Sequence, residues 1–203
     1  MRLVKNLCRI IVGIVFIYSG FVKGIDPLGS DYKFTDYFNA FGMGWMNATT
    51  LFFSFSLSLV EFLIGIALLF NLWVSRMAWG SLLFMAFFTP LTLVLALTNP
   101  VSDCGCFGDA MILTNWQTFW KNIILLLLAI MIFMYRKEYK SSLPLVGQFS
   151  FLALAGAGML CLSVYCYRHL PVLDFRPYAV GKNITEGMRL PEGAEPDQYE
   201  VTL

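Results

Sequence analysis

Cys104 and Cys106 flank a single residue, Gly105, and are the two cysteines close enough in the sequence to react with each other. Glycine allows a tight backbone turn, so the two thiols can close a very small disulfide ring. Such a ring is strained, and strain makes a disulfide easier to reduce. The flanking Asp103 and Asp109 act in the opposite direction, because nearby negative charge raises the pKa of a thiol. The pattern favours a redox pair.

Two other interpretations of this loop remain open, namely an inert turn with unpaired thiols and half of a metal site. A zinc site needs about four ligands. The single histidine, His169, and the scattered remaining cysteines supply them poorly. His169 is interpreted as a surface residue, and no metal ligands are assigned.

The composition is that of a protein in a lipid bilayer: of the 203 residues, 58% are hydrophobic and 13% are charged, and the mean hydropathy is +0.69. A spanning helix needs about 20 largely apolar residues. Five such runs lie at about 7–22, 49–70, 74–97, 116–135 and 149–167. They predict an all-α integral membrane protein. The charges form no basic stripe, so a nucleic-acid partner is not expected.

The runs divide the chain into three parts: a bundle of four spans over 1–135, a loop with a fifth span over 136–168, and a soluble tail over 169–203. The short connection after the second span predicts an antiparallel hairpin with the third. Between the first two spans, the stretch from Tyr32 to Phe41 fits either a short surface helix or a packed loop. The tail ends in an alternating pattern typical of a strand. A lone strand is unstable, which predicts pairing with a partner or continuation into a longer chain.

The distribution of lysine and arginine predicts the orientation, because cytoplasmic loops of membrane proteins carry more of both. With a cytoplasmic amino terminus, the inner segments hold seven of these residues and the outer loops hold two, Lys23 and Lys33. The cysteine loop and the tail then face the outside. In a bacterium the membrane is the inner membrane and the outer compartment is the oxidising periplasm, which permits disulfides.

Two charged residues fall inside predicted spans, Glu61 in the second and Lys121 in the fourth. An isolated charge within a membrane is costly, so a paired or functional role is the default. Lys121 is a candidate partner for Glu61. Structural pairing, proton handling, and a protonated, hydrogen-bonded Glu61 all remain open.

The other cysteines are interpreted chiefly as small apolar filler residues. Cys161 and Cys166 are five residues apart on the fifth span, so they face different sides of a helix and cannot bond to each other. Cys166, near the outer surface, is a possible relay to the Cys104–Cys106 pair. Cys8, at the inner end, is expected to be inert.

Three stretches resemble the DoxX-like superfamily and, within it, the MauE (methylamine utilisation) branch. They are the end of the first span at 19–27, the surroundings of Glu61 at 60–65, and the Cys-Gly-Cys-Phe-Gly loop at 104–108. The resemblance covers roughly residues 5–135. It implies a four-helix membrane core associated with periplasmic thiol–disulfide chemistry. MauE proteins are linked to maturation of a disulfide-rich periplasmic enzyme subunit, and DoxD-type relatives to quinone-linked sulfur oxidation.

The fifth span and the tail depart from this pattern and resemble Bacteroidetes-type members, in which a tail leads into a further periplasmic domain. Two functions are therefore expected. The first is a membrane thiol–disulfide oxidoreductase that passes electrons from periplasmic thiols through Cys104 and Cys106 to a lipid quinone. The second is a non-catalytic subunit or anchor that assembles with periplasmic or membrane protein partners. The lack of a clear second cysteine pair favours the second, and the MauE-like motif favours the first.

Overall fold

The computed structural model describes residues 2–101, 104–141 and 143–175, and over these residues the protein is helical, without strands. Tail residues 176–203, including the predicted strand, lie outside the described residues. The elements are α1 (Arg2–Ile25), α2 (Pro27–Ala40), η1 (Gly44–Thr49), α3 (Thr50–Leu69), α4 (Val74–Thr98), η2 (Gly108–Ala110), α5 (Asn115–Met134) and α6 (Leu145–Arg168).

Within the described residues, five helical segments are long and apolar enough to cross a membrane: α1, η1 with α3, α4, α5 and α6. The predicted spans are confirmed as helices, with ends that differ from the sequence-based bounds by up to a few residues. The largest differences are at the starts of α1 and α6, where residues 2–6 and 145–148 also adopt the helical conformation. The protein is therefore an all-helical membrane protein.

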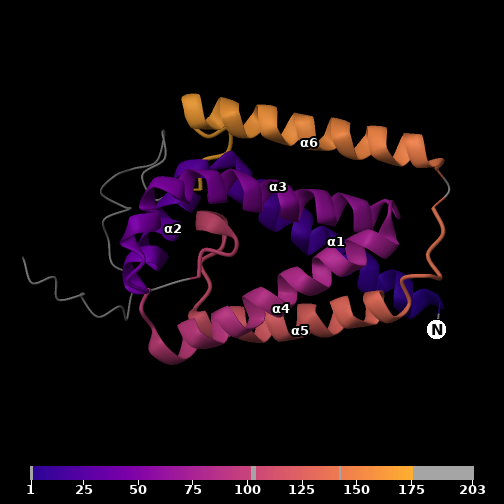
Figure 1. Ribbon diagram of the computed structural model, residues 1–203, viewed down its shortest axis with the longest axis horizontal. Coiled ribbons are helices and arrows are strands. Elements are labelled where there is room, and N and C mark those ends of the chain that lie inside the picture. Colours follow the sequence, from indigo (N-terminus) through magenta and orange to yellow (C-terminus); the bar gives the residue numbers. More distant parts are fainter. Residues whose placement is uncertain (1, 102–103, 142, 176–203) are drawn as a thin grey trace, which may run out of the picture.

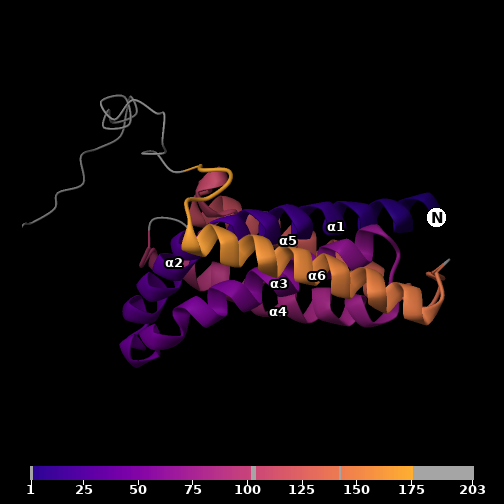
Figure 2. The same cartoon turned by 90° about the horizontal axis from the view of Figure 1, so that it is seen from above.

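The helices form two closely packed pairs, α1 with α3 and α4 with α5, and α6 lies on the outer side of α3 (Figure 1). Seen from above, α6 again runs along the bundle (Figure 2). The predicted hairpin of α3 and α4 is confirmed in direction but not in packing. The two helices diverge from their short connection and contact each other less than each contacts its other neighbour.

Glycines allow α1 and α3 to approach backbone to backbone. A Cβ atom on Gly20 of α1 would lie 2.6 Å from the Phe62 nitrogen, and one on Gly65 of α3 would lie 2.5 Å from the Ile17 nitrogen. Both distances are shorter than real Cβ atoms allow, so only glycine fits there. Small residues at such contacts are how helices pack in a membrane, where lipid removes the hydrophobic drive between them.

Of the two interpretations of Tyr32 to Phe41, the structure shows the short helix, α2, which begins earlier, at Pro27. Asp26 caps it by accepting a hydrogen bond from the Gly29 N–H at 3.0 Å, and proline is favoured at the first helical position. Phe34 and Phe38 of α2 both contact the ring of Phe53 on α3. These contacts hold α2 at one end of the bundle (Figure 1).

The two ends of the bundle differ in content. The amino terminus and the connections α3–α4 and α5–α6 lie at one end, here called the basic end. Helix α2, the last turns of α6 and the loop between α4 and α5 (residues 99–114, the cysteine loop) lie at the other, here called the cysteine end (Figures 1 and 2). Asn115 ties the two stems of the loop together, because its amide donates to Asn99 Oδ1 at 2.8 Å and to the Val101 carbonyl at 2.9 Å.

Candidate functional site

The Cys104–Gly105–Cys106 segment forms a tight turn in which the two sulfur atoms lie 3.1 Å apart without a covalent bond. Gly105 has φ +61°, a left-handed conformation that disfavours residues with a Cβ atom. The Gly108 N–H donates to the Gly105 carbonyl at 3.1 Å and closes the turn. A disulfide bond is about 2.05 Å long, so a shift of about 1 Å would join the two sulfurs.

Two hydroxyl groups hold this turn against the bundle through its backbone carbonyls. Tyr37 of α2 donates to the Cys104 carbonyl at 2.6 Å, and Ser19 of α1 lies 2.8 Å from the Cys106 carbonyl oxygen. Phe107 is buried and packs against Tyr18, with ring centroids 5.5 Å apart. The cysteine pair is therefore fixed to the bundle rather than exposed at the tip of a free loop.

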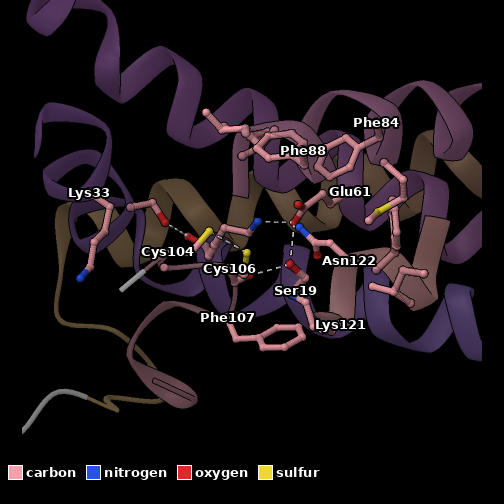
Figure 3. A pocket seen from close by; sticks show the side chains of 18 of the residues that line it. Ser19, Lys33, Glu61, Phe84, Phe88, Cys104, Cys106, Phe107, Lys121 and Asn122 are labelled. Carbon is pink, nitrogen blue, oxygen red and sulfur yellow. Dashed lines mark hydrogen bonds and ion pairs between the residues drawn. The ribbon is translucent and has the colours of Figure 1, made fainter. Parts of the chain in front are cut away.

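Both cysteines line a cavity between the two helix pairs, with about 750 Å³ of space that includes space open to the surroundings. One side of this cavity is apolar and includes Phe84, Met85 and Phe88 of α4; the rings of Phe84 and Phe88 stack with centroids 4.4 Å apart. The other side is polar and comprises Ser19, Lys23, Ser30, Lys33, Tyr37, Glu61, Lys121 and Asn122. Figure 3 shows Ser19 and Glu61 close to Cys106, whereas the Lys33 side chain extends away from the thiols.

Glu61 forms an ion pair within the bundle, and its partner is Lys23 of α1 rather than the predicted Lys121. The Lys23 Nζ atom lies 2.5 Å from Glu61 Oε2, and both residues are buried. Ser19 lies 2.9 Å from the same carboxylate oxygen. The sequence predicts Lys23 in an outer loop, whereas the structure places it within α1. Ser19 and Lys23 are four residues apart on one helix, and this spacing places both on the face toward α3.

Lys121 of α5 also lines the polar side of this cavity. Its Nζ atom lies 4.3 Å from the centre of the Phe107 ring, a cation–π contact next to the cysteine pair. The neighbouring Asn122 donates at 3.2 Å to Thr92 Oγ1 of α4, so α4 and α5 are joined by a buried hydrogen bond beside the cavity. Lys121 thus belongs to the cysteine site and not to the Glu61 ion pair.

The two thiols differ in acidity. A hydrogen bond from Cys104, followed by the positive charges of Lys121 and Lys23, lowers the pKa of Cys106 to about 6, against the opposing effects of burial and of Glu61. Hydrogen bonding to Cys106 and burial raise the pKa of Cys104. The predicted influence of Asp103 stays a prediction, because Asp103 lies outside the described residues. Among the described residues, the charges that lower the Cys106 pKa are those of Lys121 and Lys23.

The remaining cysteines lie elsewhere. Cys166 is buried on α6, a helix that contributes none of the described residues lining the cavity. Its role as a relay stays a prediction. Cys161 is exposed on α6 rather than a buried filler residue, because it falls on the face turned away from α3. Cys8 is buried in the core near the amino terminus.

His169 ends α6 as an exposed residue whose ring stacks on Tyr165, with centroids 4.6 Å apart. In the part of the chain that the structure describes, no three His, Cys, Asp or Glu side chains gather as a metal site would require.

Comparison with known proteins gives one informative result. The model of the family described as methylamine utilisation protein MauE matches residues 1–135, from the amino terminus to the end of α5. No curated protein and no solved structure matches the chain significantly. The wider DoxX-like relationship and the Bacteroidetes-type resemblance stay predictions. Since the match covers more than half of the chain, including α1, α3 and the cysteine loop, this membrane protein belongs to the MauE family.

Proposed function

We propose that this protein is a membrane thiol–disulfide redox protein that passes electrons from thiols outside the membrane to a lipid quinone. The observation that carries the proposal is the placement of two thiols, 3.1 Å apart, at the polar edge of a largely apolar cavity. The unequal acidity of the thiols adds to it, because reactive cysteines are those held as thiolates by nearby positive charge.

The difference in acidity assigns a separate role to each cysteine. When the pair is a disulfide, a client thiolate attacks Cys104 Sγ, the bond between the two sulfurs breaks, and Cys106 leaves as the more stable thiolate. A second client thiolate then attacks the mixed disulfide at the client sulfur. The client leaves as a disulfide, and Cys104 takes up a proton as the poorer leaving group. The client has lost two electrons, and the pair now holds them as a thiol and a thiolate.

The residues around the cavity fit a quinone as the group that restores the disulfide. A flat apolar ring matches the wall formed by Phe84, Phe88 and Met85, and the ammonium group of Lys121 offers donors at the polar side, where a carbonyl oxygen would need them. A bound quinone would supply a two-electron, two-proton acceptor. Lys121 and Lys23 would hold the Cys106 thiolate ready to react there.

A redox titration of the pair tests this proposal. Thiol alkylation followed by mass spectrometry should show that Cys104 and Cys106 interconvert with a disulfide clearly more oxidising than the roughly −300 mV below which structural disulfides lie. Cys104→Ser and Cys106→Ser should each abolish oxidation of a model dithiol coupled to reduction of a short-chain benzoquinone. Cys161→Ser, on the outer face of α6, is the matched control and should keep the wild-type rate.

The same titration tests the alternative function, a non-catalytic anchor or subunit. The hydroxyl contacts of Tyr37 and Ser19 support this alternative, because they fix the cysteine loop to the bundle as a structural brace would. Thiols that stay free in air, or a disulfide that resists reduction across the periplasmic range, would favour the anchor.

We further propose that the basic end faces the cytoplasm and the cysteine end faces the periplasm of a bacterial inner membrane. The basic end carries Lys5, Arg9, Arg76, Arg136, Lys137 and Lys140 on three segments that lie together. Excess lysine and arginine marks the cytoplasmic side. A cysteine introduced at Asp109 should react with an impermeant reagent in intact cells, and one introduced at Lys140 should not. The reverse pattern would overturn this orientation.

A further inference from the structure

The cavity beside the thiols has an apolar wall formed by two helices that lie apart. Leu57 of α3 and Phe88 and Leu91 of α4 line this wall with side chains that are half-buried. Other apolar residues of the same cavity, Phe16 of α1 and Leu125 of α5, are buried. The gap bounded by Leu57, Phe88 and Leu91 is here called the α3–α4 opening.

The two sides of the cavity are covered to different extents. Between α1 and α5, the buried Phe107 of the cysteine loop contacts Tyr18 of one helix and Lys121 of the other. Helices α3 and α4 instead diverge from their connection towards the cysteine end (Figure 1). Pro90 lies inside α4 next to the opening, and a proline removes one helix hydrogen bond and favours a bend. The cavity is therefore less covered at the α3–α4 opening.

The α3–α4 opening lies at the depth of the lipid hydrocarbon. Leu57 lies about two helical turns from the start of α3, and Leu91 lies about two turns from the end of α4. At about 5.4 Å per turn, both residues are about 11 Å from the cysteine end of their helices. Both helices belong to apolar spans. A ligand that uses this opening must therefore come from the bilayer and not from water.

The cavity changes from polar to apolar between the thiols and the opening. Cys104, Cys106 and Lys121 line the part at the cysteine loop, whereas Leu57 and Leu91 line the part at the opening. This change suits a molecule with a polar ring at one end and an apolar tail at the other. A phospholipid chain would fill the opening without bringing an electron acceptor to the thiols.

We propose that the α3–α4 opening admits the quinone from the bilayer and that Leu57, Phe88 and Leu91 contact its apolar tail. The acceptor is then a long-tailed membrane quinone and not a water-soluble oxidant. The three residues select the acceptor through its tail and take no part in electron transfer. The proposal rests on the proposed redox function and deepens it, because it names the class of the acceptor and its route.

Photolabelling of the wild-type protein in lipid nanodiscs tests the proposal without turnover. The probe is a fully substituted benzoquinone, which cannot add to the thiols, with a decyl tail that carries a diazirine. Labels that unlabelled decyl quinone displaces should map to α3 around Leu57 and to α4 around Phe88 and Leu91. Displaceable labels around Val15 of α1 and Leu125 of α5 instead would overturn the proposal. So would the absence of displaceable labels, which is the result expected if a phospholipid fills the opening.

Leu91→Trp narrows the opening and separates the effect of the tail from that of the ring. It should raise the dissociation constant of the decyl quinone, measured by displacement of the photolabel, by about tenfold, the effect of losing the burial of about two methylene groups. The dissociation constant of the same quinone with a methyl group in place of the tail should stay unchanged. Equal values for the decyl quinone in the variant and the wild type would exclude tail contact at the opening.

Leu93→Trp is the matched control. Leu93 lies on the same helix, is exposed, and is not among the described residues that line the cavity. This variant should bind both quinones as the wild type does. Redox titration measures separately whether the pair cycles. A cycling pair with labels elsewhere would overturn only the α3–α4 opening as the route, and labels at the opening beside a pair that does not cycle would overturn only the redox function.

Discussion

An ion pair lies towards each end of the bundle, and the two pairs differ in their surroundings. At the cysteine end, Lys23 and Glu61 are 2.5 Å apart with side chains 8% and 6% exposed. At the basic end, Lys5 and Glu138 are 2.8 Å apart with side chains 15% and 60% exposed. Of the two pairs, the first lines the cavity that Cys104 and Cys106 also line. The contrast shows that a charge in this sequence is interpretable only once its surroundings are known.

Breaking each ion pair should give the largest difference between the two ends. Lys23→Met leaves Glu61 buried without its partner and should lower the free energy of unfolding by about 3 kcal/mol. Lys5→Met leaves Glu138, whose side chain is 60% exposed, in contact with solvent and should lower the free energy of unfolding by only about 1 kcal/mol. Unfolding by sodium dodecyl sulfate in mixed micelles measures both. Equal losses of unfolding free energy would mean that burial does not determine how much each ion pair contributes to stability.

Removing a thiol at each end sharpens the comparison. Because the hydrogen bond from Cys104 is the largest cause of the low Cys106 pKa, Cys104→Ala should raise that pKa from about 6 towards the ordinary cysteine value of about 8.5. Below the raised pKa less thiolate is present, so alkylation near neutral pH should slow. Cys8→Ala, in the core near the other end, is the control and should leave the pH profile of Cys106 alkylation unchanged.

Replacing a glycine by alanine at each end of the bundle should have a smaller effect on stability. Gly105→Ala places a Cβ atom at φ +61° and 3.1 Å from Lys33 Cγ, so it should destabilise the turn by about 1 kcal/mol and slow disulfide formation. Gly147→Ala, near the start of α6, would make only ordinary contacts of 3.6 Å with Pro144. It should be neutral or slightly stabilising. The fraction of disulfide formed after mild oxidation, measured by alkylating the remaining thiols, checks this prediction. An unchanged fraction in Gly105→Ala would show that the turn tolerates alanine.

The smallest predicted effect concerns a single long-range charge. Lys121→Met should raise the pKa of Cys106 by less than Cys104→Ala does, since the charge of Lys121 ranks below the Cys104 hydrogen bond among the groups that lower it. Lys137→Met, in the exposed connection after α5, should have no effect on that pKa. The alkylation profile of Cys106 is again the measurement. A rise in the Cys106 pKa as large as the one caused by Cys104→Ala would contradict this prediction.

The helical membrane architecture was predictable because apolar runs of sufficient length have few alternatives in a bilayer. The cysteine pair was predictable for a similar reason, since a spacing of one residue brings two thiols together without help from the rest of the fold. The family resemblance of the first 135 residues is matched by the MauE family.

What failed depended on residues distant in sequence. Lys121 was chosen as the partner of Glu61 from its depth in a span, but depth does not say which helices touch, and Lys23 lies on the helix that packs closest to α3. The lysines that lower the Cys106 pKa were missed for the same reason. The sequence places two aspartates beside the cysteines, whereas the fold brings Lys121 and Lys23 to the thiol. Ser19, Tyr37 and Asn122 were not predicted, since no local pattern marks them.

The contact between Gly20 and Gly65 also bears on how the protein is made. Among the described spans, helices α1 and α3 are synthesised before α4, α5 and α6, and the glycines that let them meet lie one turn from Lys23 and Glu61. The two charges can therefore neutralise each other once the second span is synthesised, before α4, α5 or the cysteine loop exists. Integration of α3 then depends on α1 having stayed nearby at the translocon. Cys104 and Cys106 are synthesised after the Lys23–Glu61 pair and before Lys121 of α5.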